Sequence, residues 1–131
     1  MIRCGIDSVS DVQLPAQVLV KGDSFFEHTF TEHEQSLADA AADRLEFLRG
    51  RFAAKEAIFK ALGMDSDLLE RWTNIEVIVD EVGAPLIRLH GAAREHAIVR
   101  SVSSLNVSIT HDQDRHLAMC VTEASGGKEL S

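Results

Sequence analysis

The most restrictive feature of this chain is the run from Arg51 to Gly63, RFAAKEAIFKALG. With about 3.6 residues per helical turn, one side of the predicted helix is small and aliphatic. That stripe consists of Ala54, Ala57, Ile58, Ala61 and Leu62. On the opposite side Glu56 lies between the rings of Phe52 and Phe59, with Lys60 one turn along. A helix apolar on both sides belongs inside a core or an assembly, where an acidic group is rarely left unless it is paired or bound to a metal.

The length and charge of the chain exclude several classes. Its 131 residues suit one domain that buries a core without disulfides or structural metal. The net charge of -8 argues against a nucleic-acid partner, which needs a basic surface. Five of the 13 basic residues nevertheless lie between Arg44 and Lys60. This local concentration suits a small anionic ligand or an acidic protein partner.

The two cysteines and the first residues bear on location. Cys4 and Cys120 are too few for a disulfide framework and form no C-x-x-C pair, so we expect both to be reduced core residues. The chain opens on strand-like residues, without a basic leader and apolar stretch, and has no apolar run long enough to span a membrane. We therefore expect a cytoplasmic protein with no membrane partner.

The first half of the chain predicts one strand and two helices. Met1 to Val9 is strand-like, and residues 11–30 have little periodicity. Thr31 and Glu34 have the form of a capping box that begins a helix. One face of that helix carries Leu37, Ala41, Leu45 and Leu48. Gly50 is expected to separate it from the two-sided helix, which Gly63 ends.

The second half predicts a sheet. Alternation in residues 75–79 and 87–89, around a turn at Gly83, indicates a hairpin. Residues 92–100 suit a helix, and residues 105–110 and 116–122 suit two strands joined by a polar loop. We predict a small single α+β domain, residues 1–123, built around an antiparallel sheet, with a flexible C-terminal tail, residues 124–131.

Two carboxylates are the clearest candidates for chemistry. Asp7 ends a strand-like Cys4-Gly5-Ile6-Asp7, where Gly5 lets another backbone or a ligand come close. Asp7 with Glu56 would suit Mg²⁺, which is commonly held by two carboxylates with water and phosphate oxygens in its other positions. The alternative is a turn aspartate and an ion-paired glutamate.

Other polar residues have both functional and structural interpretations. Lys55 and Lys60 point in different directions from the same helix. The functional interpretation is that one of them contacts a phosphate, and the structural interpretation is that each ammonium group is solvated or ion-paired. His111 ends a strand carrying Ser108 and Thr110, where a lone histidine is more often structural than catalytic. A group with metal-like composition shares no helix face and is interpreted as surface residues: His28, Glu32, His33 and Glu34.

Taken in order, these motifs resemble those of the holo-acyl-carrier-protein synthases, the short single-domain 4'-phosphopantetheinyl transferases. The resemblance runs from about residue 2 to residue 122. Its motifs are Gly5-Ile6-Asp7, Phe30-Thr31 with Glu34, Arg51-Phe52-Ala53-Ala54-Lys55-Glu56-Ala57, Lys60-Ala61-Leu62-Gly63 and Ser108-Ile109-Thr110-His111. Trp72 before the Ile-Glu-Val strand and the Gly83-Ala84-Pro85 turn also fit. The resemblance implies a 4'-phosphopantetheinyl transferase-like fold, with an antiparallel sheet packed on a central helix.

The resemblance also implies an activity: transfer of phosphopantetheine from coenzyme A to a serine of an apo acyl carrier protein or carrier domain, releasing adenosine 3',5'-bisphosphate. Asp7 and Glu56 would hold Mg²⁺, and Lys60 and His111 would contact the phosphates of coenzyme A. Arg51 and Thr110 are expected at its nucleotide end. The family forms trimers with sites between subunits, which would explain the two-sided helix. The proton acceptor stays unassigned among a metal-bound water, Glu56 and His111.

The chain departs from the family after the aspartate strand. Family members carry several basic residues there, facing the acidic helix of the carrier, whereas residues 8–30 contain only Lys21, with Pro15 interrupting the segment. Either Arg44, Arg49 and neighbouring subunits supply a positive patch, or the carrier is less acidic, such as a domain of a polyketide or fatty-acid megasynthase.

Two other functions stay open at this stage. The same carboxylates would serve a metal-dependent phosphohydrolase in which water replaces serine. An inactive module that binds coenzyme A or a carrier would retain the fold, although it would not need the full set Asp7, Glu56, Lys60 and His111.

Overall fold

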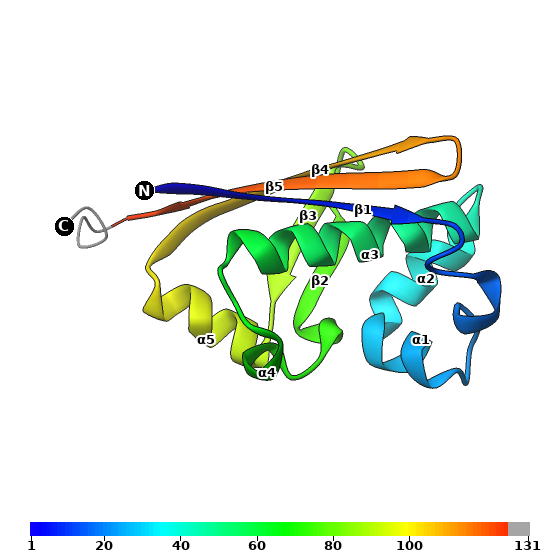
Figure 1. The fold of residues 1–131 in the computed structure, drawn as a ribbon, viewed down its shortest axis with the longest axis horizontal. Coiled ribbons are helices and arrows are strands. Elements are labelled where there is room, and N and C mark those ends of the chain that lie inside the picture. Colours follow the sequence, from blue (N-terminus) through cyan, green and yellow to red (C-terminus); the bar gives the residue numbers. More distant parts are fainter. Residues whose placement is uncertain (126–131) are drawn as a thin grey trace.

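The computed structural model describes residues 1–125 and shows a sheet lying across one long central helix, α3 (Arg44–Ala61) (Figure 1). The sheet has three antiparallel strands in the order β1 (Ile2–Ser10), β5 (Arg115–Ala124), β4 (Val102–Asp112). A second antiparallel pair is formed by β2 (Ile75–Val79), which packs on α3, and β3 (Pro85–Leu89), which packs on β4. Helices α1 (Ser24–Thr29) and α2 (Glu32–Ala40) lie at one end of the molecule, and α4 (Ser66–Leu69) and α5 (Gly91–Val99) lie at the other (Figure 1). The predicted α+β class is confirmed.

The aliphatic stripe of α3 forms the centre of the core. Its members Ala54, Ala57, Ile58, Ala61 and Leu62 are at most 2% exposed. Strand β1 packs directly on this helix because its Gly5 has no side chain. A Cβ at Gly5 would lie 2.2 Å from the carbonyl oxygen of Ala57. This close approach places the middle of β1 against the C-terminal half of α3.

The start and end of α3 follow local signals. Asp43 caps its first turn, since the Glu46 N–H donates to Asp43 Oδ1 at 3.0 Å. At the other end Gly63 has a φ of +67°, a conformation that favours glycine. The N–H of Gly63 donates to the Lys60 carbonyl, and the N–H of Met64 donates to the Phe59 carbonyl. This is the Schellman arrangement, so the predicted stop at Gly63 is confirmed.

The prediction that Gly50 separates two helices is wrong, because Gly50 lies inside α3. The break comes earlier, where Ala41 ends α2 in an extended conformation and Asp43 caps the next helix. A Cβ at Gly50 would lie 3.2 Å from Ile109 Cγ2. The glycine therefore makes room for β4 and does not end a helix.

Other elements match their predictions. The capping box of Thr31 and Glu34 is present at the start of α2, and the predicted hairpin, α5 and final two strands all form.

Cys120 is buried, and burial raises the pKa of its thiol to about 11. Cys4 is exposed, so its predicted place in the core is wrong: it faces away from α3 on a strand whose Gly5 faces inward. The predicted tail lies mostly outside the described residues.

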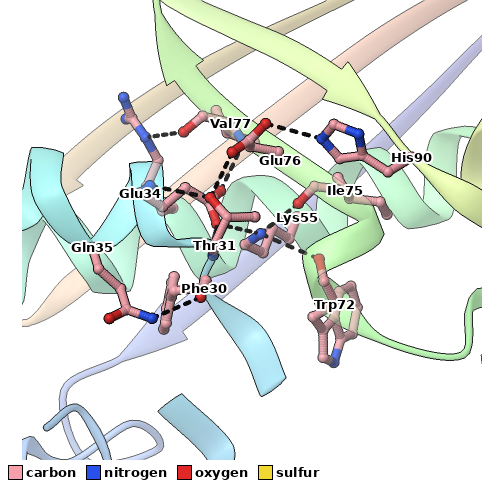
Figure 2. Close-up of polar contacts among 11 residues, drawn as sticks. Phe30, Thr31, Glu34, Gln35, Lys55, Trp72, Ile75, Glu76, Val77 and His90 are labelled. Atoms are coloured by element: carbon pink, nitrogen blue, oxygen red, sulfur yellow. Dashed lines mark hydrogen bonds and ion pairs between the residues drawn. The ribbon is translucent and has the colours of Figure 1, made fainter. Parts of the chain in front are cut away.

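A buried ion pair joins α2 to α3 (Figure 2). Lys55 Nζ lies 2.8 Å from Glu34 Oε1, and both side chains are fully buried. Lys55 also donates to the carbonyls of Trp72 and Ile75, while Glu34 Oε2 accepts from the Val77 N–H at 2.7 Å. The surface interpretation of Glu34 is therefore wrong, and the Lys55 ammonium is unavailable to a phosphate.

Within residues 1–125, no helix has the length and apolar character needed to cross a membrane.

Candidate active site

Three of the predicted site residues meet where β1 crosses α3. Asp7 comes from β1, and Glu56 and Lys60 come from α3. Lys60 Nζ donates to Asp7 Oδ1 at 2.6 Å and to the Ile6 carbonyl at 3.2 Å. The glycine two residues before Asp7 permits this meeting, because the strand can reach the helix only where no side chain intervenes. Asp7 is thus held beside Glu56 and Lys60 by one close backbone contact, although more than 45 positions of sequence separate it from either residue.

The electrostatics of this cluster are unusual. Burial raises the pKa of Glu56 to about 8, and the neighbouring Asp7 adds to the shift through a shared hydrogen bond and charge repulsion. Lys60 partly offsets the shift. Asp7 in turn raises the pKa of Lys60. A buried carboxyl group held next to a second carboxyl group marks a place where a bound cation would relieve repulsion.

The residues present fit a hard divalent cation. Asp7 and Glu56 line a cavity of about 230 Å³ together with Ser8, Val9, Gln13, Leu14 and Phe52. Within residues 1–125 no group of three or more His, Cys, Asp or Glu side chains is placed to hold a metal. Two carboxylates beside an open cavity leave the other coordination positions to water and to substrate oxygens, as Mg²⁺ prefers.

The other predicted residues line a second, larger cavity of about 550 Å³ between α3, β3 and β4. Its walls include Glu46, Arg51, Thr110, His111 and His116. This cavity shares no lining residue with the cavity of Asp7 and Glu56. In the sheet, β1 and β4 lie on opposite sides of β5 (Figure 1). The predicted site residues therefore lie in two separate cavities of the chain.

His111 is held from two directions. Its Nδ1 lies 2.8 Å from Glu46 Oε1, and its ring stacks on that of His116 at 5.3 Å between centroids. His116 is buried, and its Nε2 lies 2.9 Å from Asp11 Oδ1, while its Nδ1 has no partner within the described residues. With Nδ1 of His111 directed to Glu46, the Nε2 of that ring is left for a ligand.

Arg51 is buried more deeply than a side chain that contacts a ligand at the protein surface. Its Nε donates to the Val77 carbonyl at 2.9 Å, and its guanidinium lies over the Phe47 ring at 4.2 Å. Burial lowers the pKa of Arg51. The side chain thus ties α3 to β2 and forms part of the cavity wall. Thr110, by contrast, is exposed at the end of β4.

The structure brings the predicted residues together as two groups, Asp7 with Glu56 and Lys60, and Arg51 with Thr110 and His111. Glu46 and His116 escaped the sequence interpretation. Their partners lie 65 and 105 residues away, and neither belongs to a recognisable motif. The one local sign was the position of His116. It follows His111 by five residues across a two-residue turn, which places the two histidine rings opposite each other on neighbouring strands.

Comparison with known proteins identifies the class. The family model of the 4'-phosphopantetheinyl transferase superfamily (ACPS) matches residues 3–120, so the chain belongs to this superfamily. A holo-[acyl-carrier-protein] synthase of Clostridium tetani is 37% identical over 94% of this chain and 96% of its own length. Within the superfamily the chain therefore belongs with the holo-[acyl-carrier-protein] synthases and is an enzyme.

Another relative is a much larger protein, and two solved structures share the fold of this chain. A fatty acid synthase subunit alpha of Schizosaccharomyces pombe is 35% identical over 85% of this chain, which spans only 6% of that protein. Among solved structures, a Chronobacterium ammoniagenes ACPS-CoA complex has a TM-score of 0.81 at 30% identity and covers 96% of this chain and 99% of its own. The synthase of Neisseria meningitidis has a TM-score of 0.82 at 28% identity and covers 94% and 99%. The predicted fold is confirmed.

Proposed function

We propose that the enzyme transfers 4'-phosphopantetheine from coenzyme A to a serine of an apo acyl carrier protein or carrier domain, with Mg²⁺. The serine oxygen forms a bond to the phosphorus that bears pantetheine, the pyrophosphate bond breaks, and adenosine 3',5'-bisphosphate leaves. The serine proton is released. The observation that carries this proposal is the pairing of Asp7 with Glu56 beside an open cavity, with Lys60 on the same carboxylate.

In this proposal Asp7 and Glu56 hold Mg²⁺, which when bound neutralises charge on the pyrophosphate oxygens. Lys60 is half-exposed and places its ammonium next to Asp7, where a leaving phosphate gains negative charge. His111 offers Nε2 to a second phosphate, held in orientation by Glu46. Thr110 and Arg51 stand at the nucleotide end, Thr110 as a contact and Arg51 as a wall.

We also propose a homotrimer with each active site between two subunits. Two observations support it. The half-sites of one protomer lie in different cavities, so one subunit's Asp7 would meet a neighbour's His111. In addition, the outer face of the sheet exposes apolar side chains that a neighbouring subunit would bury: Ile2 (69%), Ile6 (61%), Met119 (48%) and Val121 (38%).

The partner of this enzyme, on the same proposal, is a carrier of fatty-acid or polyketide synthesis in the cytoplasm, where coenzyme A is available. The relatives support the fatty-acid assignment, since they include holo-[acyl-carrier-protein] synthases and the alpha subunits of fatty acid synthases. Neither nucleic acid nor a membrane is part of the proposal.

A mass-shift assay tests the reaction. The enzyme is incubated with Mg²⁺, coenzyme A and a panel of apo carriers, and the carriers are weighed by mass spectrometry. We expect the phosphopantetheine mass on at least one carrier and none without Mg²⁺. Release of a phosphate or bisphosphate product without any carrier would favour a phosphohydrolase. Coenzyme A binding that Glu56→Gln leaves unchanged, without transfer to any carrier, would indicate a binding module.

A further inference from the structure

The tip of the β4–β5 hairpin places a second histidine against His111. The buried side chains of β5 face α3, and His116 is the first of them, with its side chain only 3% exposed. It lies directly opposite His111 in the register of the two strands, at the end of the molecule where α3 begins (Figure 1). The two rings stack with 28° between their planes. The half-exposed ring of His111 therefore rests on a buried ring.

His116 is held by a carboxylate that other segments fix in place. Its Nε2 lies 2.9 Å from Asp11 Oδ1. The same oxygen lies 3.5 Å from Arg49 Nη1, and the Asp11 N–H donates to the Asp114 carbonyl at 3.0 Å. Arg49 is itself anchored, because its Nε donates to the Leu14 carbonyl at 2.9 Å. The ring of His116 thus cannot turn without losing a hydrogen bond to a restrained carboxylate.

One turn of α3 restrains both histidines. Glu46 contacts His111 directly, with 2.8 Å between Glu46 Oε1 and His111 Nδ1. Arg49 follows three residues later on the same side of the helix, and it holds Asp11, which in turn holds His116. The imidazole of His111 is therefore restrained at one edge by a carboxylate and on one face by a ring. Together these two contacts fix its plane.

Packing alone does not account for a histidine at position 116. Its Nδ1 is buried and has no hydrogen-bond partner within residues 1–125. A buried polar atom without a partner lowers stability, and an apolar ring would avoid that cost. Both histidines line the cavity of about 550 Å³. The position of His116 is thus better explained by its effect on His111 at the cavity wall than by its contribution to the core.

We infer that His116 is a positioning residue for His111. Its ring, held by Asp11, keeps the His111 imidazole in the plane in which Nε2 faces a phosphate of coenzyme A. This inference rests on the part of the proposed function in which His111 contacts that phosphate. A donor that is already oriented loses less freedom when the ligand binds, so the effect falls on coenzyme A affinity and not on the chemical step.

Two substitutions of His116 separate its ring from its hydrogen bond. His116→Phe keeps a ring against His111 without the bond to Asp11, and His116→Gln keeps a polar group without the ring. We expect His116→Gln to raise the calorimetric Kd and the KM of coenzyme A about fivefold, with kcat changed less than about twofold. His116→Phe should stay within about twofold of the wild type in all three quantities. A Kd that both variants leave unchanged or raise equally, or that His116→Phe raises more, would overturn the inference.

A His111→Ala background shows whether His116 acts through His111. In this background His116→Gln should change the Kd of coenzyme A by less than about twofold, because the ring that it positions is absent. A further loss of about fivefold would mean that His116 contacts the ligand itself, which would overturn the positioning role.

Cys120→Ala is the control for a purely structural effect. It removes a fully buried side chain from the same strand and face as His116, so it should lower Tm and leave the Kd of coenzyme A unchanged. An increase in Kd equal to that of His116→Gln would overturn the inference, since lost stability would then explain both.

The same experiments distinguish this inference from the proposed function. Coenzyme A binding with the expected pattern of variants, but without transfer to any carrier, would overturn the proposed function alone. Transfer by the wild type with no difference between His116→Gln and His116→Phe would overturn this inference alone. Absence of coenzyme A binding to the wild type would overturn both.

Discussion

Removing the charge of Glu56 should stabilise the metal-free protein while abolishing turnover. The pKa of Glu56 is raised from 4.5 to about 8, so the folded state holds this proton more tightly than the unfolded state. The stability is fully present below pH 4.5 and is lost as the pH rises through about 8, where the folded carboxyl ionises beside Asp7. Glu56→Gln keeps the shape of the side chain and removes this loss.

The magnitude follows from the shift and from the partial exposure of the carboxyl. Each unit of pKa corresponds to about 1.4 kcal/mol, and solvent screens much of the repulsion at a partly exposed group. We therefore expect Glu56→Gln to be more stable than the wild type by about 1–2 kcal/mol at about pH 9, and equally stable at about pH 4. For a chain of this length that difference raises Tm by about 4–8 °C.

Thermal unfolding in EDTA across this pH range measures the effect. Glu95→Gln, on the exposed face of α5, serves as the control and should follow the wild type at every pH. Adding Mg²⁺ should raise the Tm of the wild type and leave that of Glu56→Gln nearly unchanged, because a ligand stabilises only the state that binds it. Equal Tm values at high pH in EDTA, or equal stabilisation of both proteins by Mg²⁺, would refute the reasoning.

Three further substitutions probe the frame and the second cavity. Lys55→Met leaves Glu34 buried without its partner and should cost about 3–5 kcal/mol in urea unfolding; a loss below about 1 kcal/mol would contradict the buried pair. Gly5→Ala should cost about 3 kcal/mol or more and abolish Mg²⁺ stabilisation, since its Cβ collides with α3; a folded variant that Mg²⁺ still stabilises would refute this. Glu46→Gln should raise the KM for coenzyme A about fivefold with little change in kcat, because His111 loses its charged partner, and an unchanged KM would exclude that role.

Features set by neighbouring residues were predicted well. The capping box at Thr31 and the stop at Gly63 depend on hydrogen bonds within a few positions, so their sequence patterns are sufficient. The alternation of the hairpin and of the last two strands has the same local character. The aliphatic stripe of α3 was also evident, because helical periodicity alone places it on one face.

Features set by contacts between distant segments were missed or left open. Gly50 resembled a helix end, but its role is to admit Ile109 from β4. Lys55 was a candidate for a phosphate, and its burial depends on Glu34, which lies on another helix. The sequence suggested the pairing of Asp7 with Glu56, and the resemblance agreed with it, whereas the physical cause of their meeting, the contact of Gly5 with α3, needed the structure.

The central claim, that two half-sites from different subunits make one active site, is tested most directly by complementation. Asp7→Ala and His111→Ala are each expected to be inactive and are co-expressed with different tags, so that mixed trimers can be isolated. In every mixed trimer one of the three sites pairs an intact metal half with an intact histidine half from its neighbour, so we predict about a third of wild-type transfer activity for the isolated mixed trimers. Mixed trimers with no activity above that of the two single variants would contradict the claim.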